Sequence, residues 1–169
     1  MIEEKVLFNA TLCFLVKDNQ VLLAIKVKKI GQGCWNGYGG GIEDKETPEQ
    51  CIARELSQEA RIETMPEDFC KVAIISFHNT KADGTKFTCK VHVYLLYRWE
   101  GQAQETEEMK TPTWFYKDRL PLEDMMPADR EWLPLILNGC KIIAEVSYGP
   151  FQKTLLQKVS YQEVDSFAQ

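Results

Sequence analysis

One short stretch restricts the possible folds of this chain more than any other: a run of glycines followed by a strongly signalled helix. Residues 39–41 are three consecutive glycines, which let the backbone pass close to another group. A few residues later Thr47 offers a capping hydroxyl, Pro48 suits the first helical position and Gln50 completes a capping box. The pattern predicts a helix over residues 48–60, entered from a glycine loop.

Two glutamates lie on the same side of this predicted helix. Glu55 and Glu59 are four residues apart, so their carboxylates project side by side along the margin of an apolar stripe that contains Ile52 and Leu56. Paired carboxylates supply the hard oxygen ligands that Mg²⁺ and Mn²⁺ prefer. A solvated helix face is the alternative interpretation of the same spacing.

Runs of β-branched and aromatic residues, separated by turn residues, predict strands on both sides of this helix. The predicted strands cover residues 6–16, 21–27, 69–79, 86–99, 113–116, 141–148 and 154–161, and a second helix covers residues 127–137. No repeat or linker interrupts this order, so we expect one domain spanning residues 1–169, with six or more strands and two principal helices. The predicted fold class is α+β with a mixed sheet.

Charge and hydropathy exclude several classes of function. The 169 residues include 25 acidic and 20 basic side chains, so we expect no broad basic face for duplex nucleic acid or for an anionic membrane. The chain opens on acidic residues, and the apolar stretch that follows is broken by Asn9, Thr11 and Lys17, so we expect neither a signal peptide nor a transmembrane span. The prediction is a cytoplasmic protein that meets a small anionic partner locally.

The cysteines and histidines show no spacing typical of a metal site. Six cysteines are scattered without a C-x-x-C pair: Cys13, Cys34, Cys51, Cys70, Cys89 and Cys140. We expect reduced, mostly buried thiols, with a disulfide framework as the alternative. His78 and His92 are the only imidazole donors and both fall in predicted strands, so a zinc site is not expected.

The spacing of residues between Gly40 and Ile62 resembles the Nudix box. The matching positions are Gly40, Glu46, the triplet Arg54-Glu55-Leu56, Glu59 and Ile62. This resemblance implies the Nudix fold, an α/β/α sandwich with a mixed, curved sheet, and a hydrolase that uses Mg²⁺ or Mn²⁺. In such an enzyme the metal neutralises charge developing on phosphorus and activates a water molecule, so no covalent enzyme intermediate forms.

The same resemblance implies roles for individual residues. Glu55, Glu59 and Glu108 are the expected metal ligands, and the backbone at Gly40 lies against the ions. Glu59 and Glu108 are expected to be catalytic, Glu108 as a ligand or as the base that orients water. Arg54 is included with them because it braces the helix and its carboxylates. A solvated loop charge is the alternative for Glu108.

Beyond the box, the chain resembles the MutT branch of the family, whose members hydrolyse oxidised purine nucleoside triphosphates to a monophosphate and pyrophosphate. Residues 35–40, 105–109, 114–115, 120–137 and 163–165 carry this resemblance. We therefore expect a small nucleotide substrate, a monomer, and a substrate site that contains Asn36, Tyr38, Met109, Met126 and Asp129. The alternatives are a turn role for Asn36, core packing for Met109 and a helix cap for Asp129.

Several residues depart from the family pattern. Gln58 replaces the first of two paired glutamates, and Arg61 replaces a glycine at a left-handed position, which costs about 1 kcal/mol. In the expected base pocket, Ile30, Gly41, Met126 and Ala128 replace a phenylalanine, a lysine, a tryptophan and an aspartate. Two alternatives therefore stay open: a non-catalytic module that binds a nucleotide or a protein, and an enzyme for another nucleoside diphosphate-linked substrate.

Two further sets of charged residues lie near these segments. Asp124 and Asp129 form a candidate carboxyl pair for the base, with helix capping as the alternative. Lys26, Lys28 and Lys29 precede the glycine loop, where they could meet a triphosphate. For these lysines a solvated sheet edge is the preferred interpretation.

Overall fold

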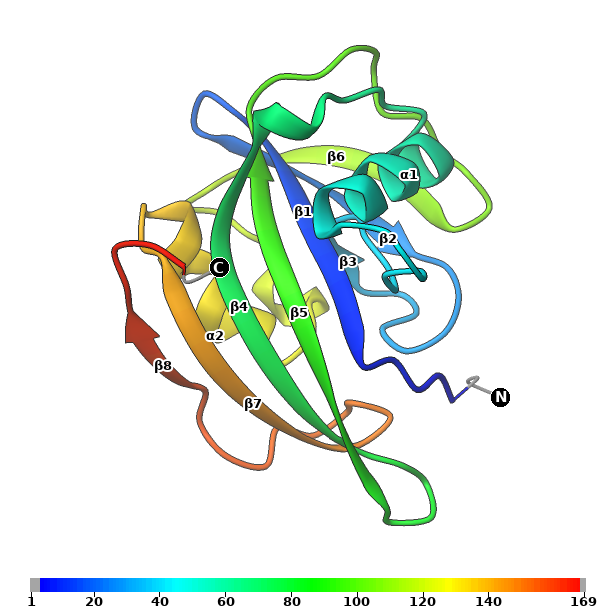
Figure 1. The fold of residues 1–169 in the computed structure, drawn as a ribbon, viewed down its shortest axis with the longest axis vertical. Helices are drawn as coiled ribbons and strands as arrows, with labels where there is room; N and C mark the ends of the chain where they lie inside the picture. Colours follow the sequence, from blue (N-terminus) through cyan, green and yellow to red (C-terminus); the bar gives the residue numbers. More distant parts are fainter. Residues whose placement is uncertain (1–3, 168–169) are drawn as a thin grey trace.

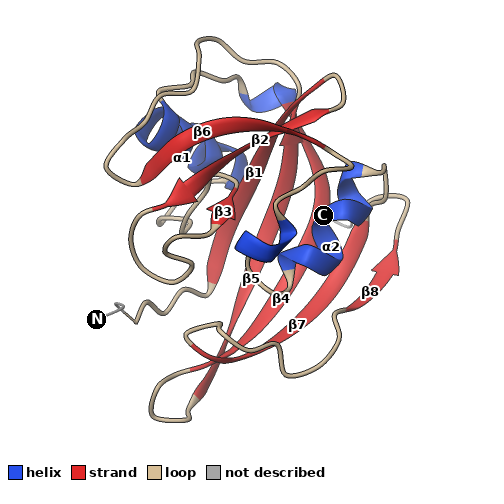
Figure 2. Cartoon of the chain, turned by 180° about the vertical axis from the view of Figure 1, so that it is seen from behind, coloured by secondary structure: helices blue, strands red, loops and turns tan. Residues whose placement is uncertain are grey.

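A mixed β-sheet runs through the molecule and carries one helix on each face (Figures 1 and 2). The computed structural model describes residues 4–167. The strands follow the order β3-β2-β1-β5-β4-β7-β8, and β6 also pairs with β2. Only the β1–β5 and β4–β7 pairs are parallel among these strands. This arrangement confirms the expected α+β fold with a mixed sheet.

The strands are short to medium in length and alternate between buried and exposed side chains over much of the sheet. Their bounds are β1 Asn9–Lys17, β2 Gln20–Lys26, β3 Trp35–Asn36, β4 Phe69–Thr80, β5 Lys86–Leu96, β6 Met109–Tyr116, β7 Ile142–Pro150 and β8 Ser160–Glu163. The β1–β2 hairpin pairs Val16 with Val21, as the turn residues between them predict.

The helix α1 spans Pro48–Ala60, the bounds predicted from its local signals. The Thr47 hydroxyl accepts a hydrogen bond from the Gln50 backbone, and the Gln50 side chain accepts one from the Thr47 backbone. Arg61 follows the helix with φ 59° and ψ 37°, so this arginine holds the left-handed conformation for which glycine is usual. The capping box and the left-handed residue thus fix both ends of α1.

The helix α2 spans Asp129–Leu137 on the opposite face of the sheet, seen in front in Figure 2. It begins two residues later than predicted, because Pro127 and Ala128 form the turn that leads into it. Two short 3₁₀ turns complete the helical segments: η1 at Pro66–Asp68 and η2 at Leu122–Asp124.

Each helix packs on its own apolar cluster. The α1 cluster includes Cys13, Leu15, Leu22, Tyr38, Ile52, Leu56, Ile62, Tyr94 and Met109. The α2 cluster includes Phe14, Leu23, Ile75, Phe77, Val93, Trp132, Leu133, Ile136 and Tyr148. Neighbouring residues of one strand, such as Phe14 and Leu15, enter opposite clusters because side chains alternate across a sheet.

The structure corrects several predicted strand boundaries, and β5 ends at Leu96 rather than at residue 99. The first strand begins at Asn9 rather than residue 6, and β6 begins at Met109 because this residue already pairs with Lys26. The strand predicted over residues 154–161 is wrong as a continuous strand: it is reduced to an isolated bridge between Leu155 and Tyr148, and continuous pairing with β7 is found only over Ser160–Glu163. Leu155 both forms this bridge and packs against the α2 cluster, so its apolar side chain marks burial rather than a full strand.

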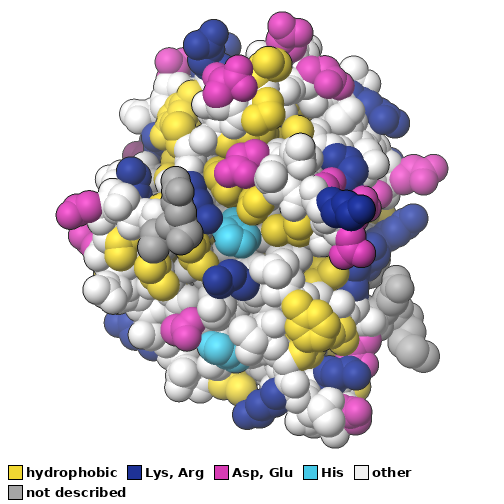
Figure 3. Space-filling model, in the orientation of Figure 1, with side chains coloured by type: hydrophobic (Ala, Val, Ile, Leu, Met, Phe, Trp, Pro, Cys, Tyr) yellow, Lys and Arg dark blue, Asp and Glu magenta, His cyan; other side chains and the backbone are white. Residues whose placement is uncertain are grey.

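The other sequence-based expectations concern cysteines, histidines and charge. All six cysteines are free thiols, as expected. His92 contacts Lys71, and His78 contacts Thr88 and Glu145; within residues 4–167 neither imidazole belongs to a group of three or more metal-ligating side chains. Acidic and basic side chains are interspersed over the face shown in Figure 3. Within residues 4–167, no helix combines the length and the apolar character that crossing a bilayer requires.

Candidate active site

Three carboxylates gather at one end of α1. Glu55 and Glu59 come from the last two turns of the helix, and Glu108 comes from the loop before β6. One oxygen of each carboxylate lies within 4.8 Å of an oxygen of the other two. Glu108 is exposed and Glu59 is buried, so the cluster reaches from solvent into the protein.

Burial makes this cluster electrostatically unfavourable without a cation. Glu59 is 7% exposed, and burial followed by the nearby Glu55 raises its pKa to about 8. The Gly39 N–H, which donates to Glu59 Oε1 at 3.0 Å, opposes this shift. Burial also raises the pKa of Glu55, and the Arg54 guanidinium opposes that change. A bound divalent ion would relieve the repulsion between these carboxylates.

Arg54 holds the loop and the helix together. Its Nε and Nη2 donate to Glu46 at 2.7 and 3.0 Å, and its Nη1 donates to Glu55 Oε1 at 3.0 Å. Nη2 also donates to the Gly41 carbonyl at 3.2 Å. The paired bonds hold the pKa of Glu46 at about 2 and raise that of Arg54. Arg54 therefore positions Glu55 relative to the glycine loop.

The glycine loop passes directly against the carboxylates and β1. The backbone of Gly40 lies so close to Glu55 that a Cβ at this position would overlap Oε1. A Cβ on Gly39 would overlap the Thr11 carbonyl, and Thr11 N donates to the Gly40 carbonyl at 2.9 Å. Glycine is required at both positions for this close approach.

Two adjoining hollows meet at the carboxylate cluster. The acidic hollow, of about 490 Å³, is lined by Lys5, Leu7, Lys26, Lys28, Lys29, Gly39, Gly40, Glu55, Gln58, Glu59 and Glu108. The apolar hollow, of about 210 Å³, lies between the sheet and the turn before α2, and its walls include Leu12, Gly37, Phe77, Val91, Met109, Met126, Asp129, Tyr148 and Gln152. The two hollows share Leu7, Lys26, Gly39, Gly40 and Glu59. They form one continuous site with a charged end and an apolar end.

Asp129 places a carboxyl group at the apolar end. It is 4% exposed, and burial raises its pKa to about 7. The Trp132 side chain and then the charge of Lys26, which lines both hollows, oppose this shift, and burial lowers the pKa of Lys26 itself. Lys26 therefore lies between the carboxylate cluster and Asp129.

The structure brings most of the predicted site residues together. Glu55, Glu59, Glu108 and Gly40 line the acidic hollow, and Met109, Met126 and Asp129 line the apolar hollow. Arg54 lines neither hollow and acts on the site through Glu55, Gln58 and the loop.

Two predicted substrate-binding residues do not line the apolar hollow. Tyr38 is fully buried in the α1 cluster, because its backbone pairs with Cys13 and turns the ring away from the hollow. The Asn36 Oδ1 accepts a hydrogen bond from the Gly37 N–H at 2.8 Å, which is the turn role that the sequence offered as the alternative.

The structure also changes the interpretation of several charged residues. Lys26 is not on a solvated sheet edge, because its side chain lines both hollows where they meet. Asp124 is exposed on η2 and lines neither hollow, so it does not form a carboxyl pair with Asp129 there. Gln58 lies at the rim of the acidic hollow, 3.5 Å from Arg54 Nη1 through its Oε1.

Sequence reasoning missed two residues of the apolar end. Tyr148 comes from β7, and Gln152 lies just beyond it with a side chain that donates to Asn79 Oδ1 at 2.9 Å. No motif marks these residues, because only the parallel pairing of β7 with β4 brings them to the site. The alternation of side chains along a strand predicts that Tyr148 points into the protein. It does not predict that Tyr148 lines this hollow.

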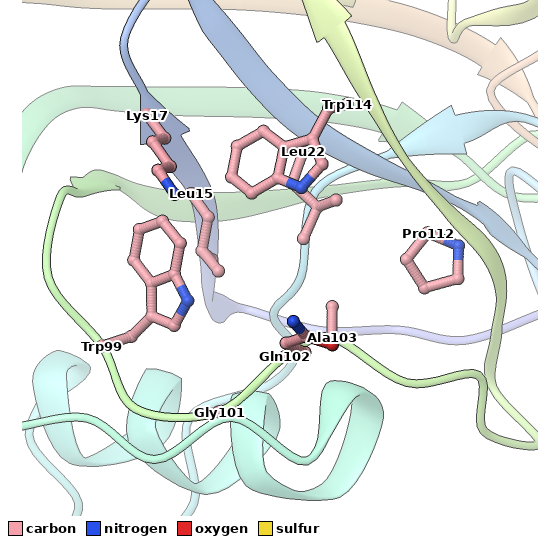
Figure 4. Close-up of a pocket in the computed structure, with 9 residues that line it drawn as sticks. All are labelled: Leu15, Lys17, Leu22, Trp99, Gly101, Gln102, Ala103, Pro112 and Trp114. Atoms are coloured by element: carbon pink, nitrogen blue, oxygen red, sulfur yellow. The ribbon is translucent and has the colours of Figure 1, made fainter.

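A further hollow, of about 510 Å³, lies between the loop of residues 99–103 and the strands β1, β2 and β6 (Figure 4). Trp99 and Trp114 stack on one another in its wall, with ring centroids 6.0 Å apart. Among residues 4–167, Lys17 is the only lining residue of this hollow with a charged side chain, and the hollow shares no lining residue with the acidic hollow. The charged groups that hydrolytic chemistry requires are therefore in the acidic hollow.

Comparison with known proteins identifies the family to which this fold and site belong. The NUDIX domain model matches residues 7–136. The chain belongs to the Nudix hydrolase family, whose members generally use divalent metal ions. The carboxylate cluster, with its buried member and its contact to a glycine loop, has the donor set and the charge that such an ion requires.

Particular relatives resemble nearly the whole chain. The oxidized purine nucleoside triphosphate hydrolase of Mus musculus is 35% identical over 157 residues, which is 93% of this chain and 96% of the relative. The protein of the same name from Danio rerio is 35% identical over 84% of this chain and 85% of the relative. The crystal structure of a MutT mutator protein from Bacillus halodurans superposes with a TM-score of 0.75 at 25% identity, covering 93% of this chain and 97% of that one.

Proposed function

We propose that the protein is a metal-dependent pyrophosphohydrolase that cleaves oxidised or otherwise modified purine nucleoside triphosphates to the monophosphate and pyrophosphate. The single observation that carries this proposal is the continuity of the two hollows through Glu59 and Lys26. One end presents carboxylates and lysines, and the other presents an apolar slot with one buried carboxyl. A nucleotide has the same division into an anionic chain and a flat base. The two vertebrate relatives that match most of this chain are named for hydrolysis of such substrates.

The acidic hollow is the proposed site of phosphate cleavage. Glu55, Glu59 and Glu108 would hold Mg²⁺, with Mn²⁺ as a substitute, because their hard oxygens converge there. Such an ion, when bound, neutralises negative charge on the phosphates and lowers the pKa of a water molecule that it holds. Glu59 and Glu108 are the proposed catalytic residues, since each offers a carboxylate that can accept a proton from water at that position.

Lysines around the carboxylates favour a polyphosphate over a neutral substrate. Lys5, Lys26, Lys28 and Lys29 line the same hollow as the three glutamates. Lys26 lies at the boundary with the apolar hollow, where a phosphate next to the nucleoside would be found. Cationic side chains that line the same hollow can bind the phosphate groups whose charge the metal does not neutralise.

The apolar hollow is the proposed site of the base. Met109 and Met126 are almost fully buried and supply flexible apolar walls, and Asp129 offers hydrogen-bonding oxygens to a base edge. The apolar contact excludes water, so a mismatched base edge leaves Asp129 without a partner at a cost of about 1–3 kcal/mol.

The experiment that tests this function measures pyrophosphate release from canonical, 8-oxo, 2-oxo and methylated purine triphosphates with Mg²⁺ or Mn²⁺. Glu59→Gln and Glu55→Gln should each lower kcat by about 100-fold or more while the circular dichroism spectrum is unchanged. Glu67→Gln, which removes an exposed carboxylate from η1 outside both hollows, is the matched control and should leave turnover unchanged.

A non-catalytic nucleotide-binding module is the second candidate, favoured by the neutral Gln58 at the rim of the acidic hollow. It predicts that nucleotides raise the melting temperature without being hydrolysed. Unchanged turnover in a folded Glu59→Gln variant would contradict the catalytic roles given above. Turnover of nucleotide sugars, dinucleoside polyphosphates or capped RNA in preference to triphosphates would instead assign a different substrate to the same site.

The monomeric state and cytoplasmic location expected from the sequence belong to the same proposal. Light scattering after size exclusion should give a mass of about 19.5 kDa, the mass of one chain. Cell fractionation tests the location.

A further inference from the structure

A buried phenol in the apolar hollow is held in one orientation by two contacts. Tyr148 is 1% exposed, and its ring stacks on Phe77 with centroids 6.1 Å apart and planes within 9° of parallel. Its Oη accepts a hydrogen bond from the Ala128 backbone N–H at 2.8 Å. Packing therefore fixes the ring, and the turn before α2 fixes the oxygen.

The hydrogen of this hydroxyl has no acceptor among residues 4–167. Tyr148 nevertheless lines the apolar hollow together with Asp129, the residue that follows Ala128 in the chain. A buried donor without an acceptor is costly, so a ligand that supplies an acceptor here gains free energy. The hydroxyl is a donor available to whatever occupies the hollow.

Asp129 and Tyr148 together define which base edge fits. When ionised, the Asp129 carboxylate offers two acceptor oxygens, and Tyr148 offers one donor. The complementary edge has a carbonyl oxygen and two N–H groups, as in guanine (O6, N1–H and the 2-amino group) and in 2-oxoadenine (O2, N1–H and the 6-amino group). Adenine has no carbonyl on this edge and leaves one carboxylate oxygen unpaired, which is costly in a buried site.

We propose that Tyr148 is a specificity-determining residue whose hydroxyl donates a hydrogen bond to a carbonyl oxygen on the pairing edge of the bound purine. The site thereby selects purines that carry such a carbonyl over adenine and 8-oxoadenine. This inference rests on the proposed function, because it takes the apolar hollow as the base site. Ala128 contributes only its backbone N–H, so the donor comes from Tyr148.

The test is Tyr148→Phe, which removes the hydroxyl and keeps the ring against Phe77. The most informative substrates are 2-oxo-dATP and dATP, because they differ only by the C2 carbonyl and the N1–H that accompanies it, followed by 8-oxo-dGTP and 8-oxo-dATP. We expect kcat/KM to fall by about tenfold or more for the two carbonyl-bearing substrates and by no more than about threefold for the other two. Equal losses across all four substrates, or no loss, would overturn the inference.

Tyr94→Phe is the matched control. Tyr94 is also a buried tyrosine with a single hydroxyl hydrogen bond, to Glu49 Oε1 at 2.9 Å, but it lies in the α1 cluster and lines neither hollow. Loss of its hydroxyl should leave the ratio between the paired substrates unchanged.

Calorimetric binding of the monophosphates 2-oxo-dAMP and dAMP separates this inference from the proposed function. If the wild-type protein hydrolyses no triphosphate, the proposed activity fails, but the base site is still tested by binding. Weaker binding of 2-oxo-dAMP alone to the folded Tyr148→Phe variant supports the inference. Unchanged affinity for both monophosphates, or an equal loss for both, overturns it.

Discussion

Asp129, the first residue of α2, is an ionisable residue whose side chain is deeply buried. The N-terminus of a helix favours a negative charge, but burial outweighs this effect and raises the pKa of Asp129 to about 7. A carboxyl group whose pKa is higher in the folded protein than in the unfolded chain takes up a proton on folding. The contribution of Asp129 to the free energy of unfolding therefore falls as the pH rises from about 4 to about 7.

We expect Asp129→Asn to raise the free energy of unfolding at pH 8 by about 1–3 kcal/mol, because each unit of pKa shift corresponds to about 1.4 kcal/mol. At pH 4 the carboxyl is protonated in the folded state, so the two proteins should differ little. Urea denaturation at pH 4, 6 and 8 measures this trend. A difference that does not grow with pH would contradict the assignment of a destabilising buried charge.

At the scale of the element, the glycine loop and α1 operate as one unit. Arg54 joins the two segments, and the Gly40 backbone lies against the Glu55 carboxylate. The position of a metal ligand on the helix is thus set in part by the loop, which is why a small change in the loop should alter metal binding.

Gly40→Ala should weaken binding of Mg²⁺ or Mn²⁺ by about tenfold or more, because the added Cβ must displace Glu55. Calorimetric titration with either metal measures the effect. Gly41→Ala is the matched control, since its Cβ meets only the flexible end of Leu7 at 2.9 Å. If both variants bind metal like the wild type, the loop does not set the position of Glu55.

The elements that could be predicted from the sequence are those whose signals are local. Thr47, Pro48 and Gln50 mark the start of α1 within four residues, and its predicted bounds agree with the structure. The clustering of Glu55 and Glu59 follows from helix geometry, whereas the approach of Glu108 was implied by family resemblance rather than by spacing.

The residues that could not be predicted depend on contacts between distant segments. Tyr148 reaches the site through the pairing of β7 with β4, two strands about 70 residues apart, and nothing near Tyr148 in the sequence indicates this. Tyr38 lies in the α1 cluster rather than along the apolar hollow, and its backbone forms a β-bridge with Cys13. The late strand failed because apolar residues signal burial as readily as pairing.

On the scale of the whole molecule, the two apolar clusters share one sheet. Leu56 lies in the α1 cluster and Leu133 in the α2 cluster, and both are fully buried. Strands such as β1 contribute side chains to both clusters, so neither half can lose its packing without weakening the other.

We expect Leu56→Ala and Leu133→Ala each to lower the free energy of unfolding by about 2–5 kcal/mol, the usual range for a buried leucine. Both variants should still unfold in a single transition, as the expectation of one domain requires. Urea denaturation followed by circular dichroism and by tryptophan fluorescence measures both quantities. Two separated transitions in either variant would show that the faces fold independently.

The order in which the two ends of the site are encoded has a consequence for how such a protein can diversify. The three carboxylates are complete by Glu108, whereas Met126, Asp129 and Tyr148 come from the last third of the chain. Duplicated genes can therefore accumulate changes after residue 116 that alter the preferred base while the phosphate chemistry is inherited intact. Exchanging this tail between two related enzymes should shift the base preference while Met109 and the apolar-hollow residues of the earlier strands stay the same.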